Sequence, residues 1–276
     1  MDTHLAGMKM FAGFASGNLI RMNRCKKIKD IGKMNKRFQF ILFSFIIVFL
    51  IISTFSCTSS PSSGPTGQFP QKASIKISGI EYMDYLLFIP SDYYKEETKK
   101  WPLILFLHGI DESGSNIELV KKNGIPKLVE EDKDFPFIVV SPRCPADHYW
   151  IPSVLKKLLN DVCSKLRVDR NRIYLTGLSM GGYGTWYTAI EYPKLFAAIA
   201  PVCGGGDPYR VCRLGNMPVW AFHGAKDTTV PPQESIGMVK ALKDCNGNVK
   251  FTLYPELGYD CWTETYNNPE LYQWFL

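Results

Sequence analysis

The sequence predicts an α/β domain of three layers, in which a mainly parallel β-sheet lies between helices. Short, nearly continuous apolar runs recur along the chain, which is typical of strands buried on both faces of a parallel sheet. Segments with helical spacing separate these runs, and this βαβα order implies right-handed crossover connections. Because chemistry in such sheets gathers at the carboxyl ends of the strands, we expect functional residues in the loops that follow the apolar runs.

Each element can be assigned in order along the chain. Two alternating segments, KASIKISGI and EYMDYLLFIP, predict an antiparallel pair at one edge of the sheet. The strands of the parallel part are then PLILFLHG (102–109), FIVVSP (137–142), RIYLTGLS (172–179), FAAIAPVC (196–203), PVWAFHG (218–224) and VKFTLYP (249–255). Helical spacing predicts helices over NIELVKKNGIPKLVEE, VLKKLLNDVCSKL, GGYGTWYTAIEY and PQESIGMVKALK. The folded domain over residues 71–276 is long enough, at about 200 residues, for one hydrophobic core.

The N-terminal part differs in composition from this domain. Residues 38–55 form an uncharged apolar run that follows a basic patch and ends at Ser56-Cys57, before a Ser/Pro/Gly tract. This order resembles a bacterial lipoprotein signal, so we expect an exported protein that a lipid on Cys57 anchors to a membrane. An uncleaved single-pass anchor is the alternative interpretation.

The predicted boundaries follow from that interpretation. Met34 opens a compact signal segment, residues 34–57, and the preceding residues 1–33 are expected to be an upstream mis-start or a disordered leader. Residues 58–70 have no apolar periodicity and predict a flexible tether.

The formal charge of +6 comes from the N-terminal part. Residues 1–56 hold 9 Lys and Arg against 2 Asp and Glu, which leaves 23 basic and 24 acidic residues in the rest of the chain. A basic surface for nucleic acid is therefore not indicated. We expect a monomer.

Six cysteines remain when Cys25 and Cys57 are set aside, and an exported protein can oxidise them. The spacing between Cys203 and Cys212 suits a disulfide that closes a loop. A disulfide between Cys245 and Cys261 would link the last strand to the helix before it. The sequence proves neither pairing. It contains no CxxC or HxxxH cluster, so we expect no structural metal.

A catalytic serine is predicted by Gly177-Leu178-Ser179-Met180-Gly181, which lies after a strand pattern and before a helix pattern. A sharp strand-to-helix turn would hold Ser179 in a strained conformation, and glycines two residues away on each side allow the backbone to approach it closely. The turn also directs the helix N-terminus at the serine oxygen, where developing negative charge is stabilised. An ordinary glycine-rich turn is the alternative.

The other parts of such a site follow from the loops. The backbone N–H of Met180 would supply one oxyanion donor, and the loop after PLILFLHG points to Ile110 as the second. His108 lies too early in the chain for the catalytic base, so we expect it to shape this loop through hydrogen bonds to backbone. Asp227, after the strand PVWAFHG, is the predicted catalytic acid, although it could instead be a solvated loop aspartate.

These motifs in combination resemble the α/β-hydrolase superfamily. The resemblance is carried by LFLHGIDESG, GLSMGGYGTW, APVCGGGDPYRVCRLGNMPVWAFHGAKDTTVPP and WTETYNNPELYQWFL, and it covers residues 75–276. It is greatest to exported carboxylesterase, feruloyl-esterase and phospholipase/carboxylesterase-like proteins, which are often lipoproteins of Bacteroides-type bacteria. The resemblance implies an α/β-hydrolase fold and ester hydrolysis through an acyl-enzyme, without a cofactor.

One position departs from the family pattern. Similar proteins carry Gly-His-Asp before Trp-Thr-Glu-Thr-Tyr, whereas this chain has Gly258-Tyr259-Asp260, so Tyr259 occupies the position of the base. A phenol with an ordinary pKa near 10 is ionised to only about one part in a thousand at pH 7. A hydrogen bond from Tyr259 to Asp227 would keep the phenol protonated, and we therefore expect weak esterase activity.

His148, in CPADHYW, allows two interpretations. It could replace the missing base, because its loop also follows a strand whose carboxyl end faces the site. The interpretation that we favour is that His148, Tyr149 and Trp150 line the rim of the pocket and contact the substrate.

Three functions remain in competition at this point. The first is a serine esterase acting on small or polysaccharide-linked acyl esters, impaired by Tyr259. The second is a non-catalytic relative that binds carbohydrate or ester ligands. The third is a peptidase related to the prolyl-oligopeptidase group, although the sequence shows no propeller or comparable gating domain.

Overall fold

The computed structural model describes residues 64–77 and 79–276. The predicted leader, the signal segment and the lipid-attachment residue Cys57 lie outside the described residues. Within the described ranges, no helix has the length and apolar character needed to cross a membrane.

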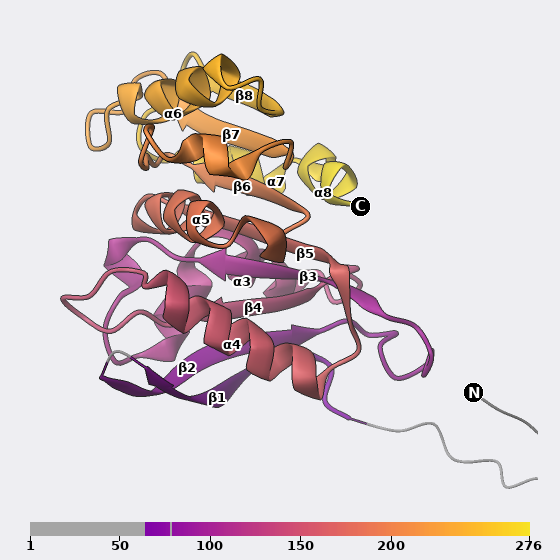
Figure 1. Cartoon of the computed structure of the whole chain (residues 1–276). Helices are drawn as coiled ribbons and strands as arrows, with labels where there is room; N and C mark the ends of the chain where they lie inside the picture. Colours follow the sequence, from indigo (N-terminus) through magenta and orange to yellow (C-terminus); the bar gives the residue numbers. More distant parts are fainter. Residues whose placement is uncertain (1–63, 78) are drawn as a thin grey trace, which may run out of the picture. The chain divides into compact units, whose positions relative to one another are not determined.

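The centre of the domain is a sheet of eight strands in the order β1-β2-β4-β3-β5-β6-β7-β8 (Figure 1). The strands are β1 (Gly67–Ile77), β2 (Ile80–Ile89), β3 (Trp101–Leu107), β4 (Ile138–Pro142), β5 (Val168–Leu178), β6 (Ala198–Val202), β7 (Val219–Gly224) and β8 (Val249–Tyr254). β2 pairs antiparallel with both β1 and β4, and all the other neighbours pair parallel. The predicted antiparallel edge pair and the predicted parallel part are both confirmed.

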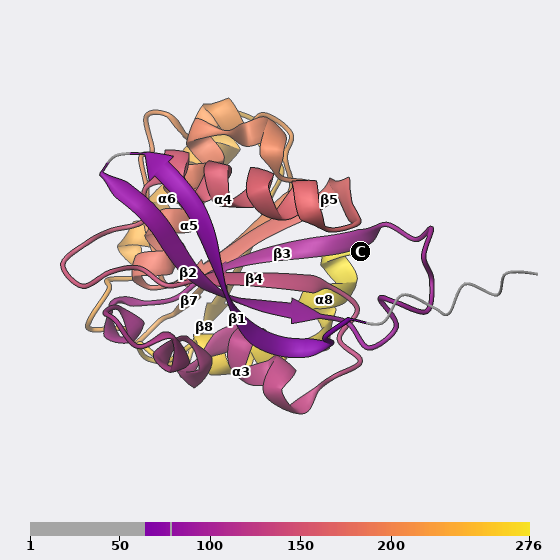
Figure 2. The same cartoon turned by 90° about the horizontal axis from the view of Figure 1, so that it is seen from below.

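Helices cover both faces of this sheet (Figure 2). They are α3 (Gly124–Glu131), α4 (Pro152–Lys165), α5 (Met180–Glu191), α6 (Gln233–Asp244), α7 (Trp262–Asn267) and α8 (Pro269–Phe275). Side chains of α4, α5 and α6 pack in one apolar cluster with the sheet, and side chains of α3, α7 and α8 pack in a second. The domain thus has the three layers that the sequence predicts, and one buried cluster lies on each face of the sheet.

Two predicted boundaries are corrected by the structure. The tether was expected to reach residue 70, but β1 begins at Gly67, and Pro70 pairs with Leu86. Proline is tolerated in an edge strand such as β1 at positions where the backbone nitrogen faces away from the sheet. The segment NIELVKKNGIPKLVEE was expected as one helix. It is instead divided into a 3₁₀ helix, Ile117–Lys122, and α3, because Gly124 has a φ of +65°, which a continuous helix does not tolerate.

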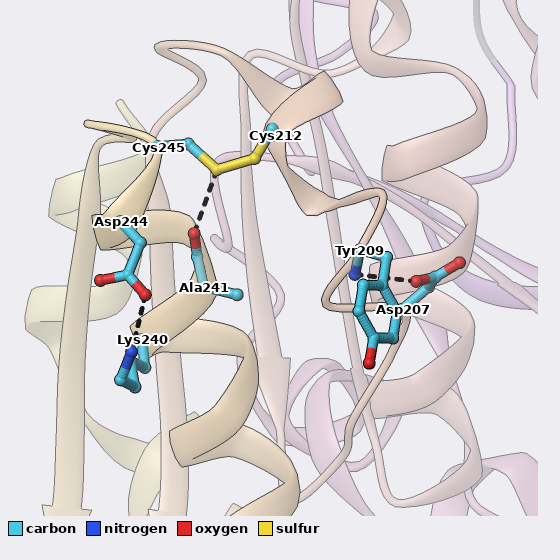
Figure 3. The surroundings of a disulfide bond; sticks show 7 residues. All are labelled: Asp207, Tyr209, Cys212, Lys240, Ala241, Asp244 and Cys245. Carbon is cyan, nitrogen blue, oxygen red and sulfur yellow. Dashed lines mark hydrogen bonds and ion pairs between the residues drawn. A yellow bond between two sulfur atoms is a disulfide. The ribbon is translucent and has the colours of Figure 1, made fainter.

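The predicted disulfide pairings are wrong. Cys212 is bonded to Cys245, which ties the 3₁₀ helix Val211–Leu214 to the C-terminal end of α6 (Figure 3). Cys203, which was expected to pair with Cys212, and Cys261, which was expected to pair with Cys245, are free and buried. Spacing along the chain could not reveal this pairing, because α6 brings Cys245 back beside the loop that follows β6.

Candidate active site

Ser179 lies at a strained turn between β5 and α5. Its φ of 52° and ψ of −116° fall outside the regions that residues other than glycine usually adopt. The two flanking glycines leave no room for a side chain. A Cβ on Gly181 would lie 2.0 Å from the carbonyl oxygen of Leu107, and one on Gly177 would lie 2.5 Å from that of Gly181. The turn therefore has the geometry that the glycine spacing predicts.

Tyr259, in the loop between β8 and α7, reaches this serine directly. Its hydroxyl oxygen lies 2.6 Å from Ser179 Oγ, and its ring packs edge to face against Trp262. Burial raises the pKa of the Tyr259 phenol above its ordinary value, and the hydrogen bond with Ser179 offsets part of this effect. The residue is thus a neutral phenol at neutral pH. The hydrogen bond to Asp227 that the sequence left open is not found within the described residues, and the hydroxyl is paired with Ser179 instead.

Asp227 lies in the loop after β7 and is 5% exposed. Its Oδ1 accepts hydrogen bonds from the N–H groups of Thr229, at 2.8 Å, and Val230, at 2.9 Å. Its Oδ2 lies 3.3 Å from His223 Nε2, but no hydrogen bond to that oxygen is found in the described part of the chain. Backbone N–H groups therefore hold one oxygen of this buried carboxylate, and the other oxygen makes no hydrogen bond within the described residues.

The loop after β3 is held by His108. The Nε2 atom accepts a hydrogen bond from the N–H of Cys144, at 3.0 Å, so the proton is on Nδ1, which donates to the carbonyl of Gly109, at 2.6 Å. Burial lowers the pKa of His108 to about 4, so the ring is neutral at pH 7. The predicted role of His108 in shaping this loop is confirmed. Ile110 and Met180 begin the helices that follow β3 and β5, so no carbonyl within those helices accepts their N–H groups.

An aromatic pocket of about 400 Å³ opens beside the serine. Its lining residues are Ile110, Tyr149, Trp150, Ser179, Met180, Tyr183, Gly184 and Tyr187. Sequence reasoning missed Gly184 and Tyr187. Tyr183 and Tyr187 are four residues apart in the predicted helix, so they lie on one face, and this spacing is the signal that would have found Tyr187.

The structure corrects the prediction for His148. The residue is exposed and is not among those that line the pocket, whereas its neighbours Tyr149 and Trp150 are. The ring Nδ1 lies 2.7 Å from the carbonyl oxygen of Ala146, within its own loop. His223 is fully buried and bonds to Ser235 and to the carbonyl of Val230. Across residues 64–77 and 79–276, no three His, Cys, Asp or Glu side chains gather closely enough to hold a metal ion.

Comparisons with known proteins agree with this geometry. The phospholipase/carboxylesterase family model matches residues 148–268. A bifunctional acetylxylan esterase/xylanase of Neocallimastix patriciarum is 25% identical over 155 residues, which are 52% of this chain and 22% of that protein. A probable feruloyl esterase C of Aspergillus terreus is 25% identical over 181 residues, 62% of this chain and 64% of that protein.

A solved structure of a thermostable esterase aligns with a TM-score of 0.66 and 32% identity, covering 76% of this chain and 62% of that one. The chain thus spans less than two thirds of each of these three relatives. A ferulic acid esterase, 18% identical, aligns over 75% of this chain and 95% of that one, with a TM-score of 0.58, which supports the fold alone. The strand order, the strained turn and these similarities show an α/β-hydrolase fold, and parts of the chain are similar to phospholipase/carboxylesterase-like proteins.

Proposed function

We propose that this protein is a serine ester hydrolase in which Ser179 is the nucleophile and Tyr259 stands where the general base is needed. The observation that carries the proposal is the strained turn that presents Ser179 Oγ between the pocket and the Tyr259 hydroxyl, 2.6 Å away. Such strain persists only where the surrounding structure enforces it, and it is typical of a nucleophile that must project above a sheet.

In this proposal, Ser179 Oγ attacks the acyl carbon of an ester, and the bond from that carbon to the alcohol oxygen breaks. The N–H groups of Ile110 and Met180 stabilise the negative oxygen that forms during the attack. Water then attacks the acyl-serine, which releases the acid and restores Ser179. The acyl group would occupy the pocket of about 400 Å³, and the alcohol would leave toward solvent.

Removal of the hydroxyl proton from Ser179 is the step of this reaction for which the site supplies no base. Tyr259 is a neutral phenol whose pKa is raised by burial, so it cannot accept that proton at pH 7. Its oxygen also cannot connect Ser179 with Asp227 as the two nitrogens of an imidazole would. The proton must therefore pass to solvent, and we infer that activity is impaired. In a related mechanism, loss of the base lowers kcat by a factor on the order of 10⁶. The remaining rate is still about 10³ times that of the reaction in water.

The substrate class rests on the pocket and on the relatives. The pocket lies beside Ser179 and is lined by four aromatic side chains, which suits an apolar or aromatic acyl group. The relatives include enzymes named for acetylxylan and feruloyl esters. We propose small or polysaccharide-linked acyl esters as substrates.

A non-catalytic ligand-binding protein is the second candidate. It is favoured by the short hydrogen bond between Ser179 and Tyr259, which engages the nucleophile without activating it, and by the oxygen of Asp227 that makes no hydrogen bond within the described residues.

The experiment that separates the two candidates compares the parent protein, Tyr259→His and Ser179→Ala in the hydrolysis of an activated acetate ester. An esterase site gains serine-dependent turnover in the histidine variant. A site built only for binding gains none, and that result would reject the proposed enzyme.

A further inference from the structure

Two buried thiols lie directly behind the candidate active site. Cys203 follows the last residue of β6, and Cys261 is the N-cap residue directly before α7. Both side chains are fully buried in the same apolar cluster, and the two thiols hydrogen bond with each other. The disulfide between Cys212 and Cys245 does not involve them, and neither has a role in the proposed ester hydrolysis.

The pair connects the two parts of the chain that bring Ser179 and Tyr259 together. Cys203 is next to Val202, whose carbonyl oxygen accepts the N–H of Ser179 at 3.0 Å. The N–H of Cys261 donates to the carbonyl of Tyr259 at 2.9 Å. A covalent bond between the two sulfur atoms would therefore join the backbone behind the serine to the loop that carries the tyrosine.

We propose that Cys203 and Cys261 form a second disulfide, which fastens the loop carrying Tyr259 to the strand beside Ser179. The burial of both side chains in one cluster, the 2.6 Å contact between Ser179 and Tyr259 beside them, and the hydrogen bond between the thiols supply the proximity. The Cys212–Cys245 bond shows that this fold already contains an oxidised pair, as expected for a protein that matures in an oxidising environment. The proposal does not depend on esterase activity.

The reaction balances with a small-molecule disulfide, such as oxidised glutathione, as the oxidant. The thiolate of one cysteine attacks the glutathione disulfide, which releases one glutathione thiolate and leaves a mixed disulfide. The second cysteine then displaces the other glutathione, so a sulfur–sulfur bond forms within the protein. Two protons and two electrons leave the cysteines, and one disulfide is reduced to two glutathione thiols.

Burial determines when this exchange can occur. Burial raises the pKa of the Cys203 thiol well above its usual range, and the hydrogen bond with Cys261 adds to this effect. The reactive thiolate is therefore scarce in the folded protein. We expect the bond to form while the chain folds, before the two side chains are buried, and to resist reduction afterwards.

The test begins with the full chain unfolded and reduced. The protein is refolded in a mixture of oxidised and reduced glutathione, the remaining thiols are alkylated in denaturant, and the digested protein is analysed by mass spectrometry without reduction. The expected result is a peptide that contains Cys203 linked to Cys261, together with the Cys212–Cys245 peptide. Alkylation of both Cys203 and Cys261 would overturn the proposal, as would a link from either one to a different cysteine.

Two variants test what the bond does. Because the Cys212–Cys245 bond already crosses the segment between Cys203 and Cys261, the second bond closes a loop of about 26 residues through it, which should shift the unfolding equilibrium constant of the oxidised protein by roughly a few hundredfold. Cys203→Ser should abolish both the linked peptide and this shift, and it should speed amide hydrogen exchange in residues 257–261. Cys163→Ser is the matched control, because Cys163 is only partly buried on α4 and should change none of these readouts. If Cys203→Ser fails to fold, the linked peptide of the parent protein still decides the proposal.

Discussion

Replacement of Tyr259 by histidine is the perturbation that the site geometry predicts most strongly to increase activity. An imidazole at this position would have Ser179 Oγ on one side, where the phenol hydroxyl now lies 2.6 Å away. On the other side we expect it to face Asp227 Oδ2, a buried oxygen that makes no hydrogen bond within the described residues, although His223 Nε2 lies 3.3 Å away. The variant would therefore provide the hydrogen bond that Asp227 lacks and the base that Ser179 lacks.

The magnitude follows from the protonation states. At pH 7 the phenol is ionised to less than about one part in a thousand, because burial raises its pKa above 10. An imidazole with an ordinary pKa near 6.5 is mostly in its basic form at the same pH. Orientation by Asp227 adds to this difference, so we expect kcat/KM of Tyr259→His to exceed that of the parent by ~10³ to 10⁶.

The assay is the hydrolysis of an activated acetate ester at neutral pH, followed by the absorbance of the released phenolate. Tyr259→Phe is the matched control, because it keeps the ring but supplies no base, and it should not exceed the parent. The double variant Tyr259→His with Ser179→Ala should be inactive. A correctly folded histidine variant without a gain, or a gain that survives loss of the serine, would refute the reasoning about this site.

Three further predictions concern the same scaffold. The rate of residual hydrolysis by the parent should rise about tenfold per pH unit from pH 7 to 9 without a plateau, because the raised pKa of Tyr259 leaves hydroxide as the base. A plateau near pH 7 in the pH–rate profile would contradict this. Burial lowers the pKa of His108 to about 4 in the folded state, so folding favours the neutral ring. The resulting stability is fully present above about pH 6.5 and is lost as the pH falls toward 4. Denaturant unfolding should show about 2 kcal/mol of this loss at pH 5, reduced in His108→Asn but unchanged in His148→Ala. In the Tyr259→His background, Gly184→Ala would place a Cβ 2.7 Å from Trp150 Cδ1 and so narrow the acyl pocket. The kcat/KM for an aromatic acyl ester, divided by that for an acetate ester, should then fall about tenfold. An unchanged ratio would show that Gly184 does not line the acyl pocket.

The strained turn at Ser179 could be predicted because its determinants are local. Gly177, Ser179 and Gly181 lie within five residues, and the strained φ of Ser179 and the close approach of Leu107 are consequences of that short segment. The place of Tyr259 could be predicted from chain order, because the loop after the last strand of a parallel sheet opens at the same edge as the loop after β5.

The features that could not be predicted depend on distances across the fold. Cys212 and Cys245 are 33 residues apart in sequence, and nothing in their neighbours indicates that α6 returns one beside the other. His148 has a side-chain type suited to the site, but its ring faces a carbonyl of its own loop. A residue type and its position after a strand predict a loop at the correct edge of the sheet. They do not predict the direction of a side chain within that loop.

The scaffold of the site does not depend on which residue stands at position 259. The turn at Ser179 is enforced by backbone contacts of Gly177 and Gly181, and Asp227 is held by two backbone N–H groups. The ring of Tyr259 packs against Trp262, and its hydroxyl is satisfied by Ser179, so the phenol fits without leaving its own polar atom unpaired. The fold therefore accepts tyrosine here, and in the proposed mechanism this residue impairs only proton transfer. A variant that restores histidine should consequently change turnover by orders of magnitude, because the surrounding structure is already arranged for it.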